Sequence, residues 1–124
     1  MKKTRAGMYR FTPLLLATAV TANAGDIDKP AALSALQESN SVLIDVRTEQ
    51  EHAEGALPGA KRIETAELSE RIGSVAPDKD APIVLYCRSG RRSSAAQDLL
   101  QELGYSRVIN AGAYDDLKTV VQYP

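Results

Sequence analysis

The chain has 124 residues, 44% of them hydrophobic and 25% charged, with a formal net charge of −1 at pH 7. Its single cysteine excludes an internal disulfide bond. One cysteine and one histidine are also too few to make a zinc site, and we expect neither a metal nor a cofactor.

Residues 1–24 are typical of a secretory signal peptide. A basic segment without acidic residues is followed by an apolar stretch over 11–22, and the segment ends in Ala22-Asn23-Ala24, an A-x-A cleavage pattern. This apolar stretch is too short to span a bilayer, which takes roughly 20 residues. We therefore expect cleavage after Ala24 and a location in the periplasm.

Residues 25–124 would then be the mature protein, which is long enough for one small domain. They hold all sixteen acidic residues but only eleven of the fifteen basic ones, which gives a net charge near −5. This acidic balance argues against general binding to nucleic acids or to membranes. We expect the mature protein to be a monomer.

Expected helices and strands alternate along this segment. In chain order the pattern predicts a helix over 28–39, a strand over 41–46, a helix over 48–55, a strand over 61–63, a helix over 65–75, a strand over 82–87, a helix over 93–103, a strand over 107–111 and a helix over 115–121. Asp28 and Thr65 are expected to cap helices, Thr48 and Glu51 have capping-box spacing, and Gly104 is a helix stop.

This alternation over short connections predicts an α/β fold of three layers, a mainly parallel sheet with helices on both faces. Ligands of such sheets bind beyond the carboxyl ends of the strands. Cys87 stands at the carboxyl end of one predicted strand, and Asp45 and Arg47 stand at the end of another. These residues are therefore candidates for a functional site.

The segment after Cys87 has the features of an anion-binding loop. Ser89 and Gly90 allow a tight turn whose N–H groups point inward, and a helix N-terminus follows. A thiol in that field should have a lowered pKa, because the field favours the thiolate. Three arginines of the loop can hold an anionic substrate with forked donors: Arg88, Arg91 and Arg92.

Alternative interpretations remain open at this point. Cys87 could be an ordinary core residue of its strand, and some of the arginines could be solvated or paired with Asp45, Asp98 or Glu102. His52 is interpreted as a surface residue of a helix rather than as the base of an acyl-transfer site. The chemistry that needs only a thiolate and an anion cradle is sulfur transfer or phosphoryl transfer.

Three segments resemble the single-domain rhodaneses (thiosulfate sulfurtransferases), most nearly the small periplasmic ones of the phage-shock type. They are LIDVRTEQEHAEGALPGA (43–60), IVLYCRSGRRS (83–93) and LGYSRVINAGAYDDL (103–117), and Ala113 stands where a second glycine is usual. The resemblance implies a rhodanese domain over residues 25–124. The family often has an aromatic residue and a histidine where His52 and Ala56 stand, so we expect altered packing at the domain edge without loss of activity.

The resemblance also implies a mechanism. The Cys87 thiolate would attack the outer sulfur of thiosulfate, expel sulfite and become a persulfide, whose sulfur passes to cyanide, a small thiol or a thioredoxin-like protein. The N–H groups of the loop Arg88–Arg92 would cradle this persulfide, and Asp45 and Arg47 would brace the loop. One or more of the loop arginines would attract the donor, so Arg92→Ala is expected to raise the KM for thiosulfate.

Other activities of proteins with this fold stay as alternatives. Related phosphatases and arsenate reductases have a loop one residue longer, with arginine at the sixth position after the cysteine. Here Arg92 is at the fifth position and Ser93 at the sixth, which favours a single sulfur atom as cargo. A persulfide carrier or sensor that acts with a protein partner is a further alternative, whereas the presence of Cys87 disfavours an inactive interaction module.

Overall fold

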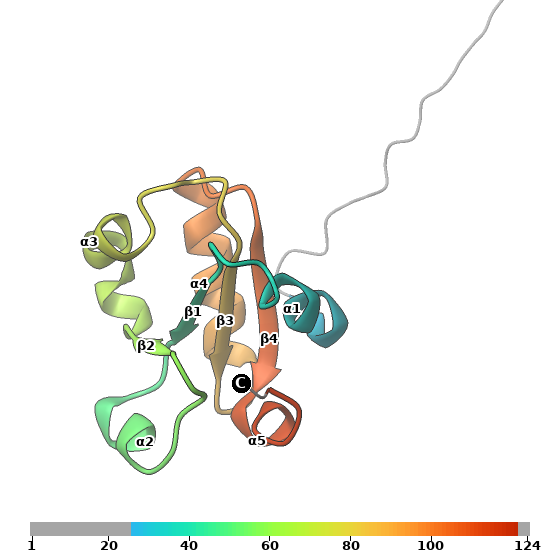
Figure 1. The fold of residues 1–124 in the computed structure, drawn as a ribbon. Coiled ribbons are helices and arrows are strands. Elements are labelled where there is room, and N and C mark those ends of the chain that lie inside the picture. Colours follow the sequence, from blue (N-terminus) through green and yellow to red (C-terminus); the bar gives the residue numbers. More distant parts are fainter. Residues whose placement is uncertain (1–25, 122–124) are drawn as a thin grey trace, which may run out of the picture.

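A computed structural model describes residues 26–121 of the chain (Figure 1). The predicted signal peptide, residues 1–24, lies outside the described residues. The described elements alternate in the order α1 (Lys29–Ala35), β1 (Val42–Asp45), α2 (Glu49–Ala53), β2 (Lys61–Arg62), α3 (Thr65–Val75), β3 (Ile83–Cys87), α4 (Arg91–Glu102), β4 (Val108–Ala113) and α5 (Tyr114–Leu117).

The four strands form one parallel sheet in the order β2-β1-β3-β4. Since side chains alternate between the two faces of a strand, successive residues of β3 enter two different cores. Ile83, Leu85 and Cys87 pack with residues of α3 and α4, whereas Val84 and Tyr86 pack with residues of α1 and α5 (Figure 1). This arrangement confirms the predicted three-layer α/β fold.

The capping signals that lie close together in the sequence are confirmed. The Asp28 carboxylate accepts a hydrogen bond from Ala31 N at 3.1 Å. At α2 the capping box is complete, because the Thr48 hydroxyl accepts from Glu51 N at 3.2 Å and the Glu51 carboxylate accepts from Thr48 N at 2.9 Å. These bonds satisfy N–H groups that the first turn of a helix leaves unpaired.

The predicted cap at Thr65 is wrong. Glu64, in extended conformation, is the N-cap residue of α3, and Thr65 is already the first residue of the helix. The Thr65 hydroxyl is buried and has no hydrogen-bond partner among residues 26–121. Threonine is a common N-cap residue, which is why the sequence suggested it. The N-cap is, however, the residue just before the backbone becomes helical, and here that residue is Glu64.

Other boundaries differ by a few residues from the prediction. Helix α1 ends at Ala35 instead of Ser39, because Gln37 N and Glu38 N donate to carbonyls three residues back (3.1 and 3.0 Å), which tightens the chain out of the α-helix. Helix α4 begins at Arg91, two residues before the predicted start. It ends at Glu102, one residue before the predicted end, and the predicted stop, Gly104, has the left-handed conformation (φ 97°).

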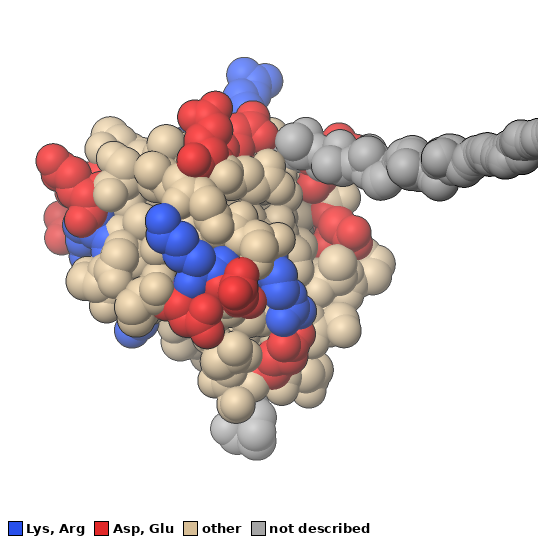
Figure 2. All heavy atoms as spheres, turned by 90° about the horizontal axis from the view of Figure 1, so that it is seen from above, with Lys and Arg blue, Asp and Glu red and all other residues tan. Residues whose placement is uncertain are grey.

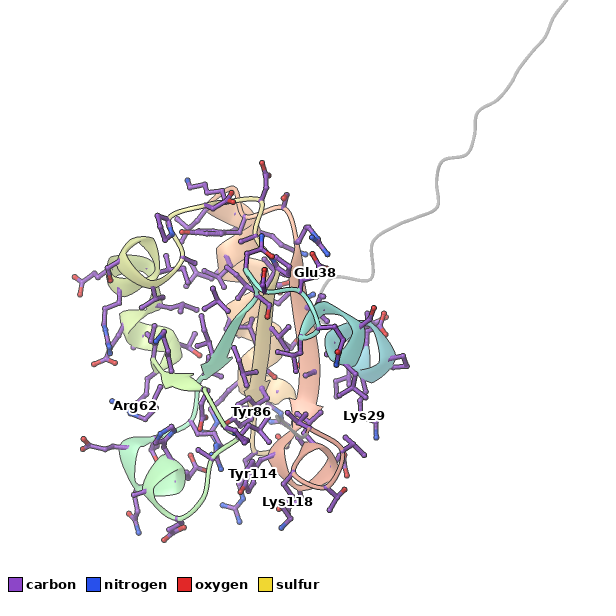
Figure 3. All side chains as sticks on the ribbon, viewed as in Figure 1. Lys29, Glu38, Arg62, Tyr86, Tyr114 and Lys118 are labelled. Carbon is purple, nitrogen blue, oxygen red and sulfur yellow. The ribbon has the colours of Figure 1, made fainter. Side chains whose placement is uncertain are left out.

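Strand β4 contains an irregularity near the carboxyl edge of the sheet. Leu85 pairs with Asn110 while the next residue, Tyr86, pairs with Gly112, so Ala111 is an extra residue in β4. Tyr86 stacks with Tyr114 at the same edge, with ring centroids 6.1 Å apart (Figure 3). This edge gathers the polar residues described below.

Charges of both signs are interspersed on the face at the opposite end of the strands (Figure 2). No helix within residues 26–121 has the length and apolar content needed to cross a lipid bilayer.

Candidate active site

Cys87 is the last residue of β3 and is fully buried against the start of α4. The chain then turns at Gly90, whose φ of 94° lies in the left-handed region that favours glycine. This turn directs Gly90 N–H to the cysteine sulfur at 2.9 Å. The Ser93 hydroxyl oxygen, one turn into α4, lies 3.5 Å from the same sulfur.

These contacts determine the charge state that the site favours. Burial raises the pKa of the Cys87 thiol, but hydrogen bonds from the Ser93 hydroxyl and from the N–H groups of Ser93, Ser89 and Gly90 lower it by more. The pKa of Cys87 is therefore below its usual value, because these donors stabilise the thiolate. Cys87 is thus a core residue of its strand, which was one interpretation of the sequence. It is also surrounded by hydrogen-bond donors, as the interpretation of an anion-binding loop requires.

Asn110 of β4 belongs to this site and was missed by the sequence analysis. Its side-chain Oδ1 lies 2.7 Å from the Ser93 hydroxyl and accepts from Gly112 N at 3.0 Å, while its Nδ2 donates to the Gly90 carbonyl at 3.1 Å. Asn110 and Ser93 are both fully buried. The one available signal was a polar residue inside an apolar strand, since buried polar groups need partners.

Asp45 and Arg47 form the ion pair that their positions at a strand end suggested. The Arg47 guanidinium donates to both carboxylate oxygens, at 2.9 and 2.7 Å, and both side chains are almost completely buried. Burial raises the pKa of Asp45, but hydrogen bonds from Arg47 more than offset this, so the carboxyl pKa is lowered. This pair also joins neighbouring segments, since Arg47 donates to Gly55 O at 2.7 Å and Tyr86 OH donates to Asp45 at 3.0 Å.

His52 is not the free surface residue that the sequence suggested. Its Nδ1 lies 3.1 Å from Asp45 Oδ2, and its side chain is one third exposed. The difference arises because α2 lies over the end of β1, so one side of this short helix meets the buried carboxylate.

The three loop arginines have different surroundings. Arg92 pairs with Glu51 of α2 through two hydrogen bonds of 2.9 and 3.0 Å, and not with Asp45, Asp98 or Glu102, the possible partners of the loop arginines named above. The side-chain hydrogen bond from Arg92 is the largest effect on Glu51 and lowers the pKa of that carboxyl to about 2. Arg91 is exposed, and Arg88 faces a pocket.

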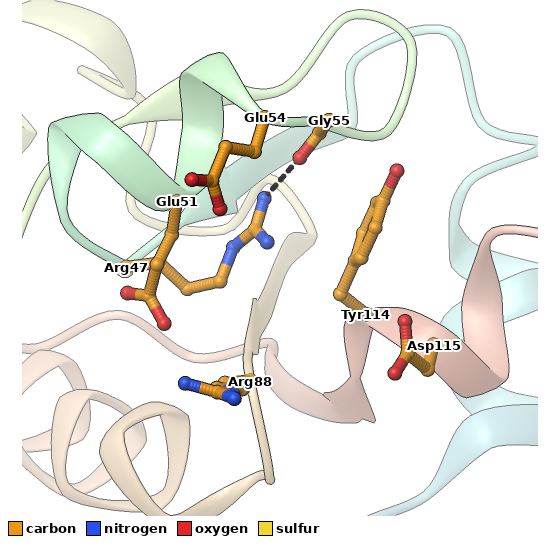
Figure 4. Close-up of a pocket in the computed structure, with 7 residues that line it drawn as sticks. All are labelled: Arg47, Glu51, Glu54, Gly55, Arg88, Tyr114 and Asp115. Carbon is orange, nitrogen blue, oxygen red and sulfur yellow. Dashed lines mark hydrogen bonds between the residues drawn. The ribbon is translucent and has the colours of Figure 1, made fainter.

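This pocket has a volume of about 300 Å³ and combines charges of both signs. Arg88 enters it from the loop after β3, Glu51 and Glu54 from the α2 side, and Tyr114 and Asp115 from α5 (Figure 4). Arg47 also lines the pocket, and its guanidinium lies 4.5 Å from the centroid of the Tyr114 ring. The pocket adjoins the Cys87 loop through Arg88. An anion that enters the pocket would therefore meet the Arg88 guanidinium beside this loop.

Within residues 26–121 no group of three or more histidine, cysteine and acidic residues could hold a metal ion.

The model of the rhodanese-like domain family matches residues 29–118. The chain belongs to the rhodanese-like family. The resemblance found in the three sequence segments is thereby confirmed.

Curated rhodaneses cover much of the chain. The thiosulfate sulfurtransferase PspE of Escherichia coli K12 is 39% identical over 74 residues, which are 60% of this chain and 71% of PspE. The human thiosulfate:glutathione sulfurtransferase is 33% identical over 106 residues, 75% of this chain and 92% of the human protein. These relatives identify a sulfurtransferase of the rhodanese type.

Solved structures of rhodaneses agree with the fold. An E. coli rhodanese with bound anions is 38% identical, with a TM-score of 0.61 and coverage of 62% of this chain and 91% of that one. The human single-domain sulfurtransferase TSTD1 is 27% identical, with a TM-score of 0.59 and coverage of 77% and 94% respectively.

Proposed function

We propose that the protein transfers sulfane sulfur from thiosulfate to a thiophilic acceptor through a persulfide on Cys87. One observation carries the proposal: the Cys87 sulfur lies at the end of β3, 2.9 Å from Gly90 N, in a turn that lowers the pKa of the thiol. The thiosulfate sulfurtransferases among its relatives support this choice of donor.

The reaction would have two steps. The Cys87 thiolate attacks the outer sulfur of thiosulfate, the S–S bond of the donor breaks, and sulfite leaves with the bonding electron pair. An acceptor then attacks the outer sulfur of the persulfide and releases the Cys87 thiolate. Cyanide would become thiocyanate, and a small thiol or a thioredoxin-like protein would become a persulfide.

The residues around Cys87 have separate roles in this proposal. The N–H groups of the turn after Cys87 stabilise the negative sulfur, because the turn fixes them in position before the charge forms. Arg88 attracts the dianionic donor from the pocket that it lines. Asp45 and Arg47 hold the segment around Gly55 against the end of the sheet and so brace the site indirectly.

The test is an assay of the purified protein with thiosulfate and cyanide, with thiocyanate as the measured product. We expect turnover that Cys87→Ala abolishes, and equal product from both proteins would refute the enzymatic proposal. Intact mass after thiosulfate treatment should show one added sulfur atom in the wild type. An adduct without turnover would instead indicate a persulfide carrier.

We further propose that residues 1–24 direct export and that the mature domain starts at Gly25. N-terminal sequencing of the protein from a periplasmic fraction of a two-membrane bacterium tests both points. The expected first residue is Gly25, whereas an intact N-terminus on protein that stays inside the cell would contradict export.

A further inference from the structure

We propose that Asn110 is a positioning residue that holds the Ser93 hydroxyl ready to donate a hydrogen bond to the Cys87 sulfur when this sulfur is an anion. The inference deepens the proposed function, since it rests on Cys87 being the nucleophile that carries sulfur. Neither Asn110 nor Ser93 was assigned a role by the sequence motifs. Three elements meet here: Cys87 ends β3, Ser93 belongs to α4, and Asn110 belongs to β4.

The partners of Asn110 determine how its amide is oriented. Gly112 N–H can only donate, so the atom 3.0 Å from it must be the amide oxygen. The Gly90 carbonyl can only accept, so the atom 3.1 Å from it must be the amide nitrogen. The oxygen of Asn110 is therefore fixed toward Ser93 and its nitrogen toward the turn.

The Ser93 hydroxyl has one proton and several acceptors within reach. Its oxygen lies 2.7 Å from Asn110 Oδ1, 3.1 Å from the Gly90 carbonyl and 3.5 Å from Cys87 Sγ. A hydroxyl proton can rotate, so it serves whichever acceptor is strongest. While the sulfur is a neutral thiol, the Ser93 hydroxyl donates to Asn110 Oδ1, which is the nearest acceptor. When the sulfur is a thiolate, the hydroxyl donates to the sulfur instead, because a charged acceptor is the stronger one.

Asn110 also fixes the turn that contains the second hydrogen-bond donor to the Cys87 sulfur. Its amide holds the carbonyl of Gly90, and the N–H of the same residue donates to Cys87 Sγ at 2.9 Å. The extra residue Ala111 in β4 lies between Asn110 and Gly112, whose N–H the Asn110 oxygen binds. Asn110, Ser93 and Cys87 are fully buried, so water screens the hydrogen bonds among them only weakly.

The charged groups near the sulfur are the same in every variant below, and they include Arg88, which lines the pocket. Arg92 of α4 interacts electrostatically with Cys87 and is bound to Glu51 of α2. At the end of β1, Asp45 is bound to Arg47. None of the substitutions below changes these pairs. A shift of the alkylation midpoint in a variant therefore reports on the hydrogen bonds of Ser93 and Asn110.

The experiment measures the rate of Cys87 alkylation by iodoacetamide in the full-length protein as a function of pH. Ser93→Ala should move the midpoint of this profile upward by about one pH unit, since a hydrogen bond to a charged group is lost. Asn110→Ala should move it upward by less, because the Ser93 hydroxyl is still present and what is lost are the bonds by which Asn110 holds Ser93 and the Gly90 turn. Ser94→Ala, on the same helix, is the matched control and should leave the midpoint unchanged.

The double variant decides whether Asn110 acts through Ser93. In the Ser93→Ala background, Asn110→Ala should add a smaller shift than in the wild-type background, since the hydroxyl that it positions is gone and only its bond to the Gly90 carbonyl is lost. An unchanged midpoint in Ser93→Ala, or an equal Asn110→Ala shift in both backgrounds, would overturn the proposal.

Circular dichroism establishes that each variant is folded. Asn110→Ser, which is expected to shift the midpoint in the same direction, replaces Asn110→Ala if the latter does not fold. Alkylation does not require sulfur transfer, so failure of this inference is distinguishable from failure of the thiocyanate assay.

Discussion

Arg88 and Arg92 are both arginines of the loop that follows Cys87, but they are not equivalent. Arg92 is bound to Glu51, whereas Arg88 lines the pocket and has no ion-pair partner among residues 26–121. An arginine already held by a carboxylate has less positive potential to offer an anion. The sequence motif could not rank these residues, because it says nothing about their partners.

We expect Arg88→Ala to raise the KM for thiosulfate about threefold to tenfold, because a partly solvated charge–anion contact is lost. Arg92→Ala should raise it less, since the Arg92 charge is compensated by Glu51. Steady-state kinetics with thiocyanate detection measure both values. Arg71→Ala removes an equal charge from α3 and should leave KM unchanged. A larger effect of Arg92→Ala than of Arg88→Ala would contradict this ranking.

Gly90 is required for its backbone conformation and for the space around it. With φ at 94°, a side chain would be strained, and a Cβ added there would lie 2.6 Å from Ile27 Cδ1. We expect Gly90→Ala to destabilise the fold by about 1–3 kcal/mol and to displace the N–H that faces Cys87. Urea unfolding and the alkylation profile measure these two effects.

Gly73 provides the control for Gly90. It lies inside α3, and a Cβ added there meets nothing within 4 Å. Gly73→Ala should stabilise the fold by about 0.5–1 kcal/mol, since alanine has the higher helix propensity. If both alanine variants behaved alike, the left-handed turn at Gly90 would not be essential.

Helices α2 and α4 are connected by the ion pair between Glu51 and Arg92. The pKa of Glu51 is lowered to about 2, chiefly by the Arg92 hydrogen bond, against 4.5 for the free side chain. A carboxyl with a lowered pKa in the folded state contributes stability that is fully present above the unfolded pKa. This contribution is lost as the pH falls from about 4.5 toward 2.

Glu51→Gln tests this connection, because glutamine can still complete the capping box at α2 while its charge is absent. We expect the variant to be less stable than the wild type at pH 7 and the difference to shrink as the pH falls below 4.5. Thermal unfolding across this pH range measures it. Glu67→Gln, which affects an exposed pair within α3, is the matched control. A difference that does not change with pH would show that the charge is not responsible.

The whole domain is expected to be a monomer, a prediction that remains to be tested. The acidic surplus of residues 25–124 makes copies repel one another at low ionic strength. Light scattering after size-exclusion chromatography should give the mass of a single mature chain at low salt. A mass of two chains that persists on dilution would contradict it.

Much of the fold could be predicted from local patterns. Strand residues 42–45 and 83–87 lie within long apolar runs, which identify strands buried on both faces, and their alternation with helices implies the parallel sheet. The bonds of Asp28 and Thr48 join residues three apart, so a short stretch of sequence already contains both partners. Cys87 at a strand end followed by a Ser-Gly turn likewise needs only adjacent residues.

By itself, therefore, the sequence determined the class of fold, the position of the proposed nucleophile and the family. Only the tertiary structure decided that Arg92 binds Glu51, that His52 approaches Asp45 and that Asn110 reaches Ser93. Helix and strand patterns depend on neighbours along the chain. These three contacts depend instead on where α2 lies over the sheet edge and on the extra residue in β4, which are properties of packing between segments.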